Sequence, residues 1–166
     1  MTIILGIDPG SRMTGVGIIK KEGQKVRFLF CDTLKTPEAD ISIKLRYIFD
    51  GISDLMLSYQ PDVVAIESVF MHKNPQSAIK LGQARGAAMV AAALKDGKVF
   101  EYSPRQIKQA VVGHGGATKE QVQHMIRQLL NLAKVPQSDS ADALAVAVCH
   151  AHSNTRLMAL LKEGAR

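Results

Sequence analysis

The chain alternates between short apolar runs of strand length and longer segments in which apolar residues recur at helical spacing. The first apolar run, residues 3–8, ends in Asp8 and is followed by Pro9-Gly10, a dipeptide that stops a strand. Two stretches of alternating residues follow at 14–19 and 26–34, with a polar turn between them. This order predicts three strands joined by short turns, an antiparallel meander.

The next two segments predict a crossover to a strand parallel to the first. Residues 41–59 carry apolar side chains along one face of a helix, and residues 63–67 form a short apolar run that ends in Glu67. Because such a crossover is right-handed, the run 63–67 can lie beside the first strand and point the same way. Asp8 and Glu67 would then share the carboxyl edge of the sheet, where open α/β sheets bind ligands.

The rest of the pattern predicts four more helices and a fifth strand. The helices are expected at 76–94, 105–112, 118–131 and from Ser138 or Asp139 onward, and the strand at 98–102. Ser103-Pro104 and Gly113 supply start and stop signals for the second of these helices. The prediction is one α/β domain over residues 1–152, a five-stranded mixed sheet flanked by helices, and a short frayed tail over residues 153–166.

Composition narrows the class of protein without naming it. The 166 residues include 21 Lys plus Arg against 15 Asp plus Glu, a net charge of +6, which favours a polyanionic partner. Cys31 and Cys149 are too few and too far apart for a disulfide framework or a thiolate metal site. No apolar stretch reaches membrane-spanning length and the chain opens directly in a strand, so we expect a cytoplasmic protein without membrane contact.

Four acids are candidates for one metal site. Asp139 and Asp142 are three residues apart and project from one helix face, although acids also favour helix amino termini for ordinary reasons. Asp8 alone could be a turn former. Glu67 directly follows Val-Val-Ala-Ile, and an acid at the end of such an apolar strand seldom lies there without an interaction partner. Four clustered carboxylates repel one another unless a cation compensates them, and hard oxygen donors favour Mg²⁺ or Mn²⁺. Two such ions about 4 Å apart activate a water for phosphodiester hydrolysis, the reaction class that this pattern predicts.

Several short motifs, in order along the chain, resemble the RuvC family of bacterial Holliday-junction resolvases, and the match covers roughly residues 2–152. The motifs are Asp8-Pro9-Gly10-Ser11 with Thr14-Gly15, Ala65-Ile66-Glu67 with Val69-Phe70-Met71, Lys80-Leu81-Gly82-Gln83-Ala84-Arg85-Gly86, Arg105-Gln106-Ile107-Lys108-Gln109 with Val112-Gly113, and Asp139-Ser140-Ala141-Asp142-Ala143-Leu144-Ala145. The resemblance implies a ribonuclease H-like fold and a homodimer that makes paired nicks in four-way DNA junctions during recombination and repair. It further implies Mg²⁺ as cofactor, replaceable by Mn²⁺ and bound as two ions per subunit with substrate, and the branch-migration proteins RuvA and RuvB as partners.

The resemblance also assigns roles to individual residues. The catalytic, metal-binding acids of the family fall on Asp8, Glu67, Asp139 and Asp142. Its junction-contacting aromatic falls on Phe70, and its DNA-binding lysines fall on Lys108 and Lys119.

The residues themselves support these DNA contacts only by position. An aromatic three residues past Glu67 can stack on an unpaired base, although Phe70 could equally be a core residue. A lone lysine is more often solvated helix surface than a phosphate contact. By position, Arg12, Lys73, Arg85 and Arg105 are further candidates for phosphate contacts.

Two other functions stay open at this point. A strand that ends in Asp-x-Gly also opens actin-like ATPases and sugar kinases, but their nucleotide lies between two such domains and this chain has length for one. A non-catalytic junction-binding module is the third hypothesis, which the complete set of acids argues against. For the dimer surface we favour the Ala- and Gly-rich helix over residues 76–94.

Overall fold

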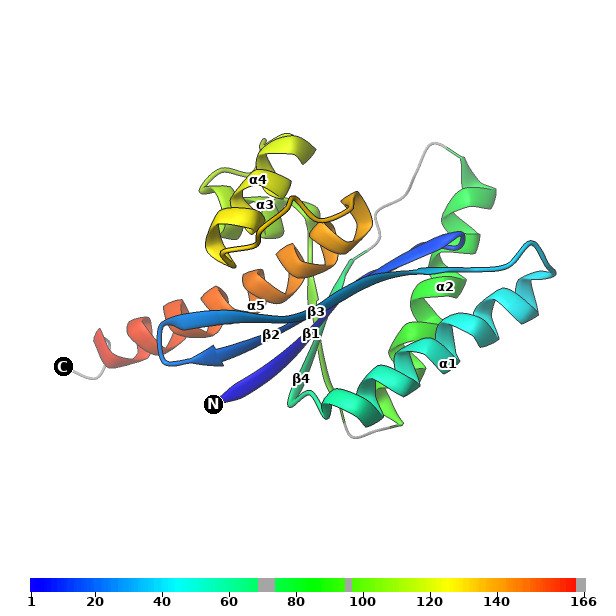
Figure 1. Ribbon diagram of the computed structural model, residues 1–166, viewed down its shortest axis with the longest axis horizontal. Coiled ribbons are helices and arrows are strands. Elements are labelled where there is room, and N and C mark those ends of the chain that lie inside the picture. The colour runs from blue at the N-terminus through cyan, green and yellow to red at the C-terminus, as the bar shows by residue number, and fades with distance from the viewer. Residues whose placement is uncertain (69–73, 95–96, 164–166) are drawn as a thin grey trace.

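The computed structural model describes residues 1–68, 74–94 and 97–163, with side chains as far as residue 153. One five-stranded sheet in the order β3-β2-β1-β4-β5 runs through the molecule, with α1 and α2 on one side and α3, α4 and α5 on the other (Figure 1). Its strands are β1 (Thr2–Asp8), β2 (Met13–Glu22), β3 (Lys25–Lys35), β4 (Val63–Glu67) and β5 (Lys98–Tyr102). Its helices are α1 (Ile41–Tyr59), α2 (Pro75–Ala93), α3 (Pro104–Val112), α4 (Lys119–Leu129) and α5 (Ser138–Glu163).

This architecture confirms the predicted five-stranded mixed sheet. Strands β1, β2 and β3 form the antiparallel meander, and β4 and β5 continue the sheet in parallel with β1. The right-handed crossover rule placed β4 beside β1 correctly. One helix is longer than we expected: α5 continues to Glu163, past the predicted start of the tail at residue 153.

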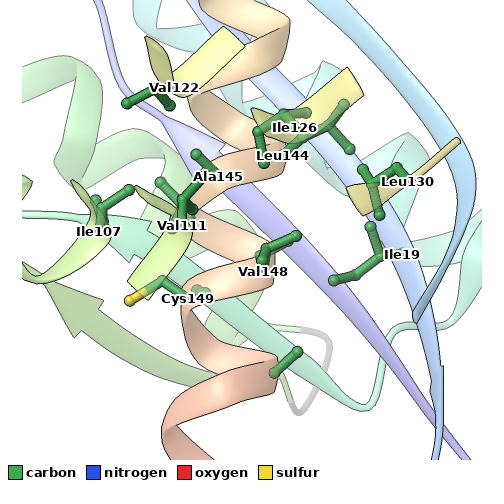
Figure 2. Packing of buried hydrophobic residues seen from close by; sticks show 14 of the residues in the cluster. Ile19, Ile107, Val111, Val122, Ile126, Leu130, Leu144, Ala145, Val148 and Cys149 are labelled. Carbon is green, nitrogen blue, oxygen red and sulfur yellow. The ribbon is translucent and has the colours of Figure 1, made fainter. Parts of the chain in front are cut away.

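Each face of the sheet has its own apolar core. Successive strand residues point to opposite faces, so Ile4 joins the cluster under α5 whereas Leu5 joins the cluster under α1 and α2. Figure 2 shows the first cluster, in which side chains of α3 and α4, among them Ile107 and Ile126, pack on α5; Ile126 lies beside Leu144 of that helix. Helix α5 is therefore buried between the sheet and the pair α3 and α4.

Glycines in β1 and β2 let α5 lie directly on the sheet. A Cβ on Gly15 would overlap the backbone oxygen of Asp139, and a Cβ on Gly6 would overlap the backbone oxygen of Ala143. The glycines of β2 therefore make room for a neighbouring helix, because Gly15 faces Asp139 and Gly17 faces Leu144. The contact at Gly15 fixes the first turn of α5 against the end of β1.

Two further observations complete the fold. Cys31 and Cys149 are free thiols, as expected from their spacing. In the described ranges, the helices lack the combination of length and apolar character that crossing a bilayer requires.

Candidate carboxylate site

The acids reach one edge of the sheet from three separate elements. Asp8 and Glu67 are the last residues of the neighbouring parallel strands β1 and β4, whose register pairs the preceding residues Ile7 and Ile66. Asp139 lies in the first turn of α5. Gly15 fixes the position of that turn. It pairs with Asp8 between β1 and β2, and because it has no side chain, the backbone of Asp139 packs directly against it.

A buried threonine secures the turn that follows Asp8. The hydroxyl of Thr14 donates a hydrogen bond to the Gly10 carbonyl oxygen at 2.8 Å and accepts one from the Gly10 amide at 3.3 Å. Thr14 is fully buried, so these bonds also satisfy a hydroxyl that would otherwise be costly to bury. We did not single out Thr14 from the sequence for this function, although a hydroxyl at the start of an apolar strand is a usable signal.

The electrostatics of the site show that its acids lie close enough to repel one another. Burial is the largest of the effects that raise the pKa of Asp8 to about 9, followed by a hydrogen bond with Glu67. The charges of Glu67, Asp142 and Asp139 raise it further. Burial also raises the pKa of Glu67, against the opposing effect of the hydrogen bond from Asp8. At neutral pH and without a cation, Asp8 is therefore protonated and donates to the Glu67 carboxylate.

Two lysines face these acids across a pocket of about 250 Å³. The Nζ of Lys119 lies 2.8 Å from Oδ2 of Asp142, with the two side chains 50% and 24% exposed. Burial raises the pKa of Asp142, and the hydrogen bond from Lys119 opposes that rise. Burial lowers the pKa of Lys119, but Asp142 and the other acids bring it above its ordinary value. The pocket is lined by Glu67, Pro104, Ile107, Lys108, Lys119, Val122, Asp142 and Ala145.

The donor chemistry of this cluster fits a hard divalent cation. Carboxylate oxygens are the ligands that Mg²⁺ and Mn²⁺ prefer, and a cation would offset both the burial and the repulsion that raise the pKa of Asp8. Within the described ranges, no three His, Cys, Asp or Glu side chains have their donor atoms already arranged to hold an ion. One candidate oxygen, on Asp142, is engaged by Lys119.

The remaining predicted residues fall in different places. Phe70 and Lys73 lie outside the described residues. Arg85 of α2 forms an ion pair with Glu101 of β5, away from the lysine-lined pocket. Arg105 lies in the first turn of α3, where Gly115 leaves room for its side chain. Arg105 also lines a second pocket of about 440 Å³, together with Ser103, Gln106, Gln109, Ala110, His152 and Ser153.

The order of the strands and the acids at the carboxyl edge of the sheet define a protein of the ribonuclease H-like class. The family profile described as crossover junction endodeoxyribonuclease RuvC matches residues 4–150. This chain belongs to that family, as the motifs in the sequence predicted.

Relatives support the same assignment along most of the chain. The crossover junction endodeoxyribonuclease RuvC of Shewanella oneidensis is 58% identical over 96% of this chain and 92% of its own length. That of Tolumonas auensis is 57% identical over 95% of this chain and 91% of its own length. The family assignment thus covers the sheet, α5 and both lysine-bearing helices.

Solved structures share the fold. The RuvC of T. thermophilus in complex with Holliday junction substrate superposes with a TM-score of 0.88 at 36% identity, covering 93% of this chain and 95% of that one. The yeast mitochondrial Holliday junction resolvase Ydc2 has a TM-score of 0.70 at 13% identity, covering 93% of this chain and 81% of that one, which shows the fold alone.

Proposed function

We propose that this protein is a structure-selective endonuclease that resolves Holliday junctions by paired, symmetric nicks in recombination and repair. The observation that carries the proposal is the convergence of Asp8, Glu67 and Asp142 beside two lysines, in a chain that belongs to the RuvC family. The relatives that match this chain along nearly their whole length are named crossover junction endodeoxyribonucleases. This name favours a nuclease over an ATPase or a non-catalytic module.

In this proposal, Asp8, Glu67, Asp139 and Asp142 hold Mg²⁺, or Mn²⁺ in its place, as two ions per subunit when substrate is bound. The bound ions supply Lewis-acid activation of a water and stabilisation of the leaving oxygen. Asp8 has to release its proton to become a ligand, since its pKa is raised to about 9 without a cation. Asp142 has to exchange its contact with Lys119 for a contact with the ion.

Basic residues hold the DNA strand against the acids in this mechanism. Lys108 and Lys119 line the acid pocket, so their charges can neutralise phosphates next to the scissile one. Stacking of Phe70 on an unpaired base stays a prediction, as does a phosphate contact of Lys73. Arg105 and Arg85 also stay predicted phosphate contacts, and Arg85 would have to leave Glu101 to make one.

A homodimer would match the approximate twofold symmetry of a four-way junction and present one site to each of two strands. The outer face of α2 is our proposed dimer surface. Ile79 and Val90 are exposed there, and Gly82 and Gly86 have open space where a side chain would lie. Small residues on an exposed helix face allow the second subunit of a twofold dimer to approach closely.

RuvA and RuvB as partners, and a cytoplasmic location, stay predictions from the sequence.

The dimer surface can be tested with Gly86→Arg, which introduces a long charged side chain on the outer face of α2. We expect sedimentation to show a monomer, because the arginine occupies the space of the mate. Asp54→Arg on the exposed face of α1 is a control that should stay dimeric. A Gly86→Arg variant that sediments as a dimer would exclude this face.

The function is tested by incubation of the protein with a synthetic four-way junction and Mg²⁺, with a linear duplex of the same sequence as control. We expect two nicks at symmetric positions in opposite strands of the junction, and products that a ligase can seal. Asp142→Asn should bind the junction without nicking it. Equal cleavage of the linear duplex would contradict selectivity for structure, and absence of any nicking would contradict the nuclease itself.

A further inference from the structure

Lys119 lies at an unfavourable place for a cation if only its own helix is considered. It is the first residue of α4, which Thr118 and Gln121 cap through a capping box. The amino terminus of a helix carries a partial positive charge and disfavours a neighbouring ammonium group. The side chain is instead compensated from outside the helix, by Asp142 of α5 at 2.8 Å.

The contact occupies a carboxylate that the proposed metal site uses. Oδ2 of Asp142 accepts the hydrogen bond from Lys119, and Lys108 of α3 lines the same pocket beside Glu67. An ammonium group and a divalent cation compete for one carboxylate, because both are bound by its negative charge. Removing the ammonium group should therefore make the carboxylate more available to the ion.

We propose that Lys119 is a removable counter-ion, a positioning residue that compensates Asp142 in the metal-free protein and leaves it when the ion binds. The inference rests on the proposed metal-dependent function. It gives Lys119, so far proposed only as a DNA contact, a second function in the metal-free protein. In the metal-bound state the released ammonium group is free to contact a phosphate of the junction.

The character of the pair suits such an exchange. Half of the Lys119 side chain is exposed, and its four-carbon stem can rotate away from Asp142 without moving α4. Ion pairs of this exposure are weak, so a divalent ion can displace the lysine at low cost. An arginine at this position would bind a carboxylate through two parallel bonds and leave less readily.

The test is Mn²⁺ binding without DNA, measured by calorimetry, in the full-length wild type and in Lys119→Gln. We expect the variant to bind Mn²⁺ about 1.5-fold to fivefold more tightly at low salt, the range that corresponds to losing one partly exposed ion pair. Lys119→Arg should bind Mn²⁺ no more tightly than wild type. Where the heat is too small to fit, the rise of the melting temperature with Mn²⁺ concentration gives the same comparison.

Lys25→Gln is the matched control, since it removes the same charge from the far end of the β2–β3 hairpin. Lys25 forms no ion pair with any residue that the structure describes, and seven strand residues, about 23 Å, separate that end from Gly15. We expect its Mn²⁺ affinity to equal that of wild type. An affinity of Lys119→Gln that is unchanged or weaker would overturn the proposal.

The Mn²⁺ affinities of Asp8→Asn and Asp142→Asn test the metal site separately from the function of Lys119. If both of these variants bind Mn²⁺ as tightly as wild type, the proposed metal site is wrong. If they bind it more weakly while Lys119→Gln binds like wild type, the metal site stands and only the counter-ion role of Lys119 fails.

Discussion

Asp8→Asn should stabilise the metal-free protein even though it removes a proposed metal ligand. The pKa of Asp8 is about 9 in the folded protein and near 3.8 when the group is unperturbed. Between these two values the folded chain binds more protons than the unfolded chain, so the free energy of unfolding falls as the pH rises. Asparagine has the same shape and can donate a hydrogen bond to Glu67, but it has no proton to lose.

The size of the effect follows from the same pKa. One pKa unit corresponds to about 1.4 kcal/mol. Because pH 7 lies about three pH units above the ordinary pKa of 3.8, the free energy of unfolding can rise by at most about 4 kcal/mol when Asp8 is replaced. Asp8 is partly exposed, and screening by solvent reduces this limit. We expect Asp8→Asn to be about 1–3 kcal/mol more stable than wild type at pH 7 in EDTA, and the difference to shrink toward pH 4.

The measurement is urea unfolding in EDTA at several pH values between 4 and 9, on wild type and Asp8→Asn. Asp54→Asn, an exposed acid of α1 on the opposite side of the sheet, is the control and should follow the wild-type curve. Added Mg²⁺ should stabilise wild type more than Asp8→Asn, because only wild type keeps the full set of ligands. Parallel pH curves for wild type and Asp8→Asn would refute the raised pKa of Asp8.

Three further predictions concern activity and the placement of α5. Glu67→Gln or Asp142→Asn should bind the junction in a gel shift while cleavage falls by several orders of magnitude, and full nicking activity in either would refute its assignment as a ligand. Lys119→Ala should weaken junction binding and reduce the slope of log affinity against log salt by about one, and an unchanged slope would remove it from the phosphate contacts. Gly15→Ala should lower the free energy of unfolding by about 1–3 kcal/mol, because its Cβ overlaps the backbone of Asp139. Wild-type stability and activity of Gly15→Ala would contradict the close packing of α5 on β2.

The sequence predicted the positions of the acids because they depend on regular geometry. The ends of two parallel strands must meet at one edge, which brings Asp8 to Glu67, and helical spacing sets Asp139 and Asp142 on one face. Capping signals placed the start of α4 at Thr118 within one residue. These rules act over short distances along the chain or through strand pairing.

Side-chain partners from distant elements could not be predicted in the same way. Nothing in the sequence pairs Lys119 with Asp142 or Arg85 with Glu101, because these contacts depend on how helices dock on the sheet. The glycines of β2 do not reveal their function in the sequence either, because an open glycine face admits either a ligand or a helix. Only the docking of α5 decides between the two.

The docking of α5 therefore links folding to the proposed chemistry. The same helix supplies Leu144 to the core under α3 and α4 and carries Asp139 and Asp142 to the end of β1. Repulsion among the acids opposes this arrangement without a cation, whereas burial of the apolar face of α5 favours it. Since larger side chains at Gly6 or Gly15 would keep the helix off the sheet, these strands carry glycine at a cost in strand stability. The close approach that these glycines allow is what brings acids from distant parts of the chain into one charged site.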